Sequence, residues 1–187
     1  LVCRRGELMQ AAAEEQPTAM AAVLKLPNEA VEELCGQFPE TYPVNYNCPG
    51  QLCCAGNPDQ LDAFAARVKE EGGRGVKLAV SGAFHTPYMD AAGDVLRDTL
   101  AGMAMKAPEI PLYANRTAAP YPSDRKGMTD NVAAQVCSPV LWEALLRNSR
   151  SAVEGATPRL LRVVTHPGSS HEVVMVGQEV AAVARAS

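Results

Sequence analysis

The order of periodic apolar segments between residues 17 and 80 constrains the fold most. Four short apolar runs typical of strands stand at residues 20–26, 44–47, 51–55 and 76–80. Two intervening segments, 31–38 and 61–68, carry apolar side chains at i, i+3, i+4 and i+7, which places each set on one face of a helix. The resulting order of strand, helix, strand, strand, helix and strand predicts a ferredoxin-like unit.

The residues between the second and third runs predict a hairpin. Cys48-Pro49-Gly50 combines a proline, which fixes one backbone angle, with a glycine, which allows the second conformation that a tight reversal needs. In the strand that follows, the adjacent Cys53 and Cys54 point to opposite faces, which suits packing better than metal chelation.

The chain after residue 80 has a different pattern. Helical spacing is expected at 89–103, 131–136 and 140–146, and strands at 110–115 and 160–164. Helices that alternate with single strands indicate the later part of an α/β layer. We therefore predict that residues 1–16 and 81–187 belong to a large α/β core and that 17–80 are inserted into it. Because the sequence begins with Leu1 and lacks the first part of such a core, we expect a longer parent chain.

Composition argues against several kinds of partner. The chain has 17 Lys and Arg against 21 Asp and Glu, a net charge of -4, without the clustered basic residues that nucleic-acid binding requires. No apolar run approaches the ~20 residues of a membrane span. The six cysteines form no CxxC pair and are too sparse for a secreted disulfide scaffold, so we expect reduced thiols and no metal or other cofactor.

The stretch "SGAFHTPYMD", residues 81–90, places one of only three histidines between small residues and a proline-marked turn. Histidine is the side chain best suited to proton transfer near neutral pH. A single histidine in this setting is more often a structural residue with both ring nitrogens satisfied than a catalyst. Pattern alone therefore leaves both interpretations of His85 open.

Six stretches in order resemble a known family: "RRGELMQAA", "MAAVLKL", "NYNCPGQLCCAG", "VSGAFHTPYMDAA", "KAPEIPLYAN" and "NVAAQVCSPVLW". Together they resemble malonyl-CoA:acyl carrier protein transacylase over about residues 1–148. The resemblance implies a ferredoxin-like subdomain inserted into an α/β-hydrolase-like acyltransferase core, of which only the later part is present. It also implies a cytoplasmic or plastid enzyme of type II fatty acid synthesis, with malonyl-CoA as substrate and acyl carrier protein as partner.

The resemblance assigns the catalytic roles. Malonyl moves from coenzyme A to a serine and then to the pantetheine thiol of acyl carrier protein, with His85 as the general base and acid. The backbone carbonyl of Gln135 is expected to hold the tautomer of His85, while the Gln135 side chain takes no part. No Gly-His-Ser-Leu-Gly elbow and no Gly-Gln-Gly loop occur in the 187 residues. We therefore expect the serine upstream and no turnover by this chain alone.

Four further residues are implied in substrate binding. Arg5 is expected to hold the free malonyl carboxylate through two parallel hydrogen bonds, although a solvated surface arginine is the alternative. Phe84 is expected to restrict the acyl pocket to malonyl. Asn47 is placed near the mouth of the site, where a turn-forming role explains it equally well. Met9 either lines the acyl pocket or packs in the core.

Three functions stay open at this point: a malonyl transacylase fragment, the acyltransferase domain of a polyketide or multifunctional synthase, and a non-catalytic remnant that binds coenzyme A or a protein. The C-terminal stretch "VVTHPGSSHEVVMVGQEV" departs from the family pattern and adds His166 and His171. Without further ligands at suitable spacing, surface histidines explain them better than a metal site.

Overall fold

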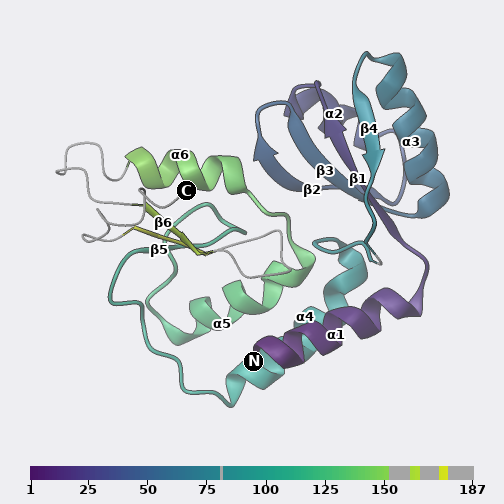
Figure 1. The fold of residues 1–187 in the computed structure, drawn as a ribbon. Helices are drawn as coiled ribbons and strands as arrows, with labels where there is room; N and C mark the ends of the chain where they lie inside the picture. Colours follow the sequence, from purple (N-terminus) through teal and green to yellow (C-terminus); the bar gives the residue numbers. More distant parts are fainter. Residues whose placement is uncertain (81, 152–160, 165–172, 177–187) are drawn as a thin grey trace.

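The computed structural model describes residues 1–80, 82–151, 161–164 and 173–176 (Figure 1). The N-terminal elements are α1 (Val2–Glu15), β1 (Ala19–Leu24), α2 (Asn28–Cys35), β2 (Thr41–Cys48), β3 (Gln51–Gly56), α3 (Pro58–Glu70) and β4 (Arg74–Lys77). The later elements are η1 (Pro87–Met89), α4 (Asp90–Ala101), β5 (Leu112–Tyr113), α5 (Arg125–Ala134), η2 (Gln135–Cys137), α6 (Trp142–Ser151), β6 (Leu161–Val164) and β7 (Val173–Val176). The chain is thus an α/β protein, as predicted.

A four-stranded antiparallel sheet with strand order β2-β3-β1-β4 organises the segment from β1 to β4. The predicted order of strands and helices over residues 17–80 is confirmed. The hairpin between β2 and β3 turns at Pro49 and Gly50, and Gly50 adopts the left-handed conformation with φ of +77°. A residue without a Cβ takes that conformation at little steric cost, which explains the glycine.

Helices α2 and α3 cover one face of this sheet. Asn57 caps α3 by accepting hydrogen bonds from the backbone N–H of Asp59 at 3.0 Å and of Gln60 at 3.3 Å, and Pro58 follows at the first helical position. Most of the apolar residues that predicted the two helices are buried between the helices and the sheet, and Phe38, just after α2, packs against them. The buried cluster consists of Ala19, Ala21, Val23, Val31, Leu34, Cys35, Leu52, Cys54, Leu61, Phe64 and Val68.

The opposite face of the sheet is covered by the loop that carries the predicted site. Its buried cluster joins Met20, Ala22, Val44, Cys53 and Ala55 of the strands to Ala83 of the loop. Cys53 belongs to this cluster and Cys54 to the one beneath the helices, so the prediction that they face opposite sides is confirmed. Cys53 and Cys54 are free thiols, as are Cys3, Cys35, Cys48 and Cys137.

A third apolar cluster joins α1, η1, α4, the end of α5 and η2, and includes Met9, Met89, Leu96, Leu100 and Val136. Near it, β5, β7 and β6 form an antiparallel sheet in that order. Two backbone hydrogen bonds connect the groups of elements: Tyr46 N–H donates to Val140 O at 3.0 Å, and Val140 N–H donates to Val44 O at 2.7 Å.

Several predicted boundaries were wrong by a few residues. The strand predicted at 76–80 is β4, which spans Arg74–Lys77, because its pairing with β1 ends at Lys77 opposite Ala21. The helix predicted at 131–136 begins at Arg125, because the Asp124 carboxylate accepts a hydrogen bond from Gly127 N–H at 2.8 Å and caps the helix there. Strand β7 was not predicted.

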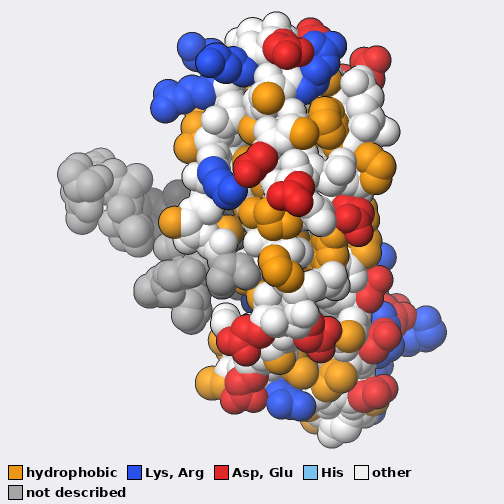
Figure 2. Space-filling model, turned by 90° about the vertical axis from the view of Figure 1, so that its right-hand side faces the viewer, with side chains coloured by type: hydrophobic (Ala, Val, Ile, Leu, Met, Phe, Trp, Pro, Cys, Tyr) orange, Lys and Arg blue, Asp and Glu red, His pale blue; other side chains and the backbone are white. Residues whose placement is uncertain are grey.

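Figure 2 shows one side of the molecule, with basic and acidic side chains interspersed at the top and a larger number of acidic ones near the bottom. Hydrophobic side chains occupy much of the area between them. On this face the basic residues form no continuous band. Among the described helices, none is both long enough and apolar enough to cross a membrane.

Candidate functional site

The loop from Gly82 to Thr86 lies between the four-stranded sheet and α1. Gly82 packs so closely on α1 that a Cβ at this position would lie 2.7 Å from the Cβ of Ala13. His85 has φ of +66°, a left-handed conformation that costs a non-glycine residue roughly 1–3 kcal/mol, although histidine tolerates it better than most. The surrounding contacts must therefore hold this conformation.

His85 is bonded to η2 through both its backbone and its ring. Its backbone N–H donates to Val136 O at 3.0 Å. Its Nδ1 lies 2.9 Å from the backbone oxygen of Gln135. Because a carbonyl oxygen can only accept, Nδ1 carries the proton, and in the neutral ring Nε2 is the nitrogen that accepts one. This is the contact that the resemblance implied, while the catalytic role of His85 stays a prediction.

His85 is only 5% exposed, and burial is the main reason why its pKa is lowered. Hydrogen bonds with the backbone of Gln135 and Ser138 act in the opposite direction, because they favour the protonated ring, while the positive charge of Arg5 lowers the pKa further. The balance favours a neutral imidazole at physiological pH, which is the form that can accept a proton.

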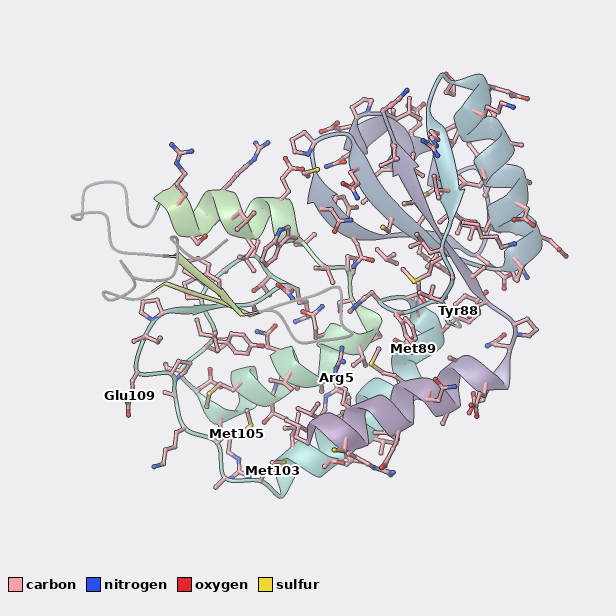
Figure 3. The ribbon with its side chains drawn as sticks, in the orientation of Figure 1. Arg5, Tyr88, Met89, Met103, Met105 and Glu109 are labelled. Carbon is pink, nitrogen blue, oxygen red and sulfur yellow. The ribbon has the colours of Figure 1, made fainter. Side chains whose placement is uncertain are left out.

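Arg5 is half-buried on α1 and projects from this helix on the side of α5 (Figure 3). Burial lowers the pKa of its guanidinium. Within the part of the chain that the structure describes, its side chain makes no hydrogen bond or ion pair. The neighbouring Arg4 differs, because it is exposed and its Nη1 lies 3.4 Å from Oε2 of Glu7. A half-buried cation that lacks a protein anion favours an anionic ligand.

Phe84 and Met9 have different surroundings. Phe84 is half-buried and packs against both the cluster on the sheet face and the cluster on α1 and α4. Met9 is 9% exposed and is a member of the latter cluster. The structure thus gives Met9 a packing role, and a part in the acyl pocket stays a prediction for both residues.

Asn47 lies on β2, where its Nδ2 is 3.6 Å from the Sγ of Cys53. It is half-buried and belongs to the strand itself, just before the hairpin turn. The Asn47 side chain thus contacts the neighbouring strand of the hairpin. No interaction between the side chains of Asn47 and His85 is found among the described residues.

Sequence reasoning missed the side chains that hold the His85 loop. Thr18, between α1 and β1, accepts a hydrogen bond from Ala83 N–H through its Oγ1 at 2.8 Å. Thr86 is 1% exposed, and its Oγ1 donates to Ala83 O at 2.6 Å. The contact of Thr18 joins residues 65 positions apart, so no local pattern could reveal it. Thr86 precedes a proline, and this was a detectable signal for a cap.

Asn131 was missed as well. It lies on α5, one turn before Gln135, and is 3% exposed. Both its Oδ1 and its Nδ2 are buried and find no hydrogen-bond partner in the described part of the chain. Such a group is costly to bury, but nothing in the sequence distinguishes this asparagine from an exposed one.

A separate pocket of about 250 Å³ lies between α2, β2 and α6. Its lining groups bond to one another: the Tyr46 hydroxyl donates to Glu32 at 2.6 Å, and Asn28 Nδ2 donates to Glu143 at 3.0 Å. It contains none of the residues predicted for the site. The catalytic hypothesis therefore rests on the loop of His85 rather than on this hollow.

Two predicted residues lie elsewhere in the chain. His166 and His171 fall outside the described residues, so the interpretation of them as surface histidines stays a prediction. In the described ranges, no group of three or more His, Cys, Asp or Glu is placed to hold a metal ion.

Known proteins share both sequence and fold with the chain. The model of the acyl transferase domain matches residues 1–186. The malonyl CoA-acyl carrier protein transacylase of Escherichia coli strain K12 is 32% identical over 146 residues, which cover 76% of this chain and 47% of that protein. The acyl carrier protein S-malonyltransferase of Vibrio cholerae superposes with a TM-score of 0.75 at 33% identity, covering 80% of this chain and 50% of that one.

A further similar structure is that of a type II polyketide acyl-carrier protein in complex with its malonyl-transacylase. It superposes with a TM-score of 0.74 at 28% identity, covering 83% of this chain and 50% of that one. The chain spans about half the length of the curated relatives that it matches. Because the family model covers nearly every residue, the chain belongs to the acyl transferase domain family.

Proposed function

We propose that the chain supplies the base and the carboxylate-binding part of a site that transfers malonyl from malonyl-CoA to acyl carrier protein. The observation that carries this proposal is the pairing of two groups. One is a buried His85 whose Nδ1 is fixed by the Gln135 carbonyl. The other is Arg5, which lacks an anionic partner among the described residues and lies close enough to lower the pKa of that histidine. We infer the identity of the acyl group and of the carrier from the names of the relatives.

In this proposal His85 moves the proton at each step. Nε2 takes the proton of a serine hydroxyl as the serine oxygen attacks the thioester carbonyl of malonyl-CoA, and the C–S bond breaks as the thiol leaves with that proton. The carrier thiol then loses its proton to Nε2 and attacks the serine ester, and the C–O bond to serine breaks as the serine oxygen leaves with that proton. A neutral ring is required before each attack, which is the form that burial favours.

Arg5 would hold the free carboxylate of the malonyl group. A guanidinium and a carboxylate form two parallel charge-assisted hydrogen bonds, which fix the acyl group in one orientation. Binding this anion would also compensate the cost of a partly buried cation. The same negative charge would offset the effect of Arg5 on His85, so substrate binding is expected to raise the pKa of the histidine.

The remaining assignments are part of the same proposal. The nucleophile is a serine outside the 187 residues, because none of them lies in a Gly-x-Ser-x-Gly elbow. Residues 17–80 form a ferredoxin-like subdomain, supported by the strand order β2-β3-β1-β4, and residues 1–16 and 81–187 belong to an α/β-hydrolase-like core. The reaction uses no cofactor and takes place in the cytoplasm or plastid stroma.

The test compares Arg5→Ala with Arg4→Ala in a protein completed by a serine-bearing upstream segment. Arg5→Ala should lower kcat/KM for malonyl transfer, with a loss of transition-state stabilisation of roughly 2–5 kcal/mol. Acetyl transfer should be largely unaffected, because acetyl lacks the carboxylate. Arg4→Ala, which removes an exposed charge paired with Glu7, should change neither. Equal losses for both acyl donors would refute the role of Arg5.

A further inference from the structure

The backbone N–H and C=O of Ala83, two residues before His85, are each bonded to a threonine hydroxyl. Thr18 Oγ1 accepts from Ala83 N–H at 2.8 Å, and Thr86 Oγ1 donates to Ala83 O at 2.6 Å. Ala83 is fully buried, so neither group can be satisfied by water if its partner is lost. The two threonines come from different parts of the chain, and we call this arrangement the Ala83 clamp.

The clamp acts on the part of the loop where the backbone is least favourable. His85 follows Ala83 by two residues, is bonded to η2 through Gln135 and Val136, and has φ of +66°. Its ring contact with Gln135 depends on that conformation, because the side-chain direction follows from the backbone angles. Thr86 also accepts a hydrogen bond from Tyr88 N–H at 3.3 Å, which fixes the start of η1. The loop is thus bonded before, within and after the histidine.

We propose that Thr86 and Thr18 are positioning residues that keep the His85 ring against the Gln135 carbonyl, and so set its tautomer, by holding the backbone of Ala83. This inference rests on the proposed function of His85 as a base. The threonines touch no reacting atom in the proposal. Their hydroxyls hold the ring in its buried position against Gln135, so the Nδ1–H tautomer persists and Nε2 accepts the proton.

Four variants separate the hydroxyl from the volume of the side chain. Thr86→Val and Thr18→Val remove one hydrogen bond each with little change in size, while Thr86→Ser and Thr18→Ser keep the hydroxyl. Thr99→Val is the matched control, because Thr99 Oγ1 donates to a backbone oxygen, that of Val95, at 2.8 Å on α4. Thr18 is half-buried and Thr86 is 1% exposed, so the Thr18 pair still tests the proposal if Thr86→Val fails to fold.

The readout is the nitrogen NMR spectrum of His85 in the 187-residue chain over a pH titration, assigned with His85→Gln. We expect both valine variants to move the His85 pKa upward toward its ordinary value and to lose the pure Nδ1–H tautomer, and we expect the serine variants and Thr99→Val to match the wild type. In the serine-completed protein, the valine variants should lower kcat by up to about 10²-fold with little change in KM.

The result that overturns the proposal is an unchanged His85 pKa and tautomer in folded Thr86→Val and Thr18→Val. Serine variants that behave like the valine variants would also overturn it, because the hydroxyl would then not be the cause. Loss of the tautomer in the valine variants, combined with absence of transfer by the completed wild-type protein, would support the clamp and refute the proposed function, so the two failures are distinguishable.

Discussion

The four-stranded sheet with α2 and α3 and the loop around His85 are stabilised in different ways. The sheet unit buries a cluster in which every side chain is apolar or a thiol. In the loop, the buried side chains of His85 and Thr86 are polar and bond to the backbone of Gln135 and Ala83. Burial of apolar side chains thus stabilises the core between the sheet and its two helices. A few directional hydrogen bonds hold the loop around His85 in its conformation.

The largest effect is expected from His85→Ala in the serine-completed protein. Loss of the general base should reduce transfer by roughly 10²–10⁴-fold, since neither the serine nor the carrier thiol can lose its proton efficiently. The circular dichroism spectrum should stay that of the wild type, because the sheet unit does not depend on this residue. Near-normal transfer would mean that His85 is structural.

In the sheet unit, Phe64→Ala should have a large effect on stability. Phe64 is fully buried between α3 and the sheet and contacts the ring of Phe38 edge-on at 5.8 Å. Its removal should lower the free energy of unfolding by roughly 3–5 kcal/mol in urea titrations. Ala66→Gly, an exposed change on the same helix, should cost only about 1 kcal/mol. Equal costs would contradict the packing of this core.

Gly82→Ala tests how tightly the loop is fitted to α1. The added Cβ would lie 2.7 Å from the Cβ of Ala13, so one of the two segments must shift, at an expected cost of roughly 1–3 kcal/mol. Ala13→Gly makes room, and the double variant should therefore be more stable than the sum of the two single changes predicts. Strict additivity in thermal unfolding would argue against this contact.

Phe84→Ser tests the acyl pocket. A ring beside the acyl carbon leaves little room for an α-methyl branch. The smaller side chain should therefore raise kcat/KM for methylmalonyl relative to malonyl, by a difference in transition-state free energy of about 1–3 kcal/mol. A competition assay with both donors in the completed protein measures the ratio. Phe38→Ser, in the core of the sheet unit, is the control and should leave the ratio unchanged.

The sheet unit could be predicted from the pattern of residues, whereas the contacts of the loop around His85 could not. Apolar residues spaced with the period of a helix, such as Val31 and Leu34 in α2 and Phe64 in α3, indicated both helices of the sheet unit. Site residues near one another in the chain, such as Phe84 and His85, were proposed from a family resemblance. Thr18 could not be predicted, since its partner Ala83 is 65 residues away and hydroxyls are common in turns.

The C-terminal elements show a second limit. Strand β7 pairs with β5 and β6, but only four residues form it, and a short apolar run does not distinguish a strand from other buried segments. Helix boundaries depended on caps: Asp124 moved the start of α5 several residues ahead of the apolar pattern. Asn131 is buried for reasons of tertiary packing that no local pattern carries.

The lowered pKa of His85 also predicts a dependence of stability on pH. The unfolded state binds a proton at about pH 6.5, whereas the folded state resists it, so the stability associated with His85 is complete above pH 6.5. It should be lost as the pH falls from about 6.5 through the lowered pKa of the folded state. The difference between wild type and His85→Gln in urea titrations isolates this contribution, and a pH-independent difference would contradict it.

The most direct measurement is an NMR titration of His85 in the wild-type chain, assigned by comparison with His85→Gln. We expect the pKa of His85 to lie below its ordinary value of 6.5. We also expect the neutral ring to carry its proton on Nδ1, which faces the Gln135 carbonyl at 2.9 Å. Addition of malonate should raise the pKa, because its carboxylate would neutralise Arg5. A pKa at or above 6.5, or a neutral ring with the proton on Nε2, would contradict the central claim that His85 is poised to accept a proton.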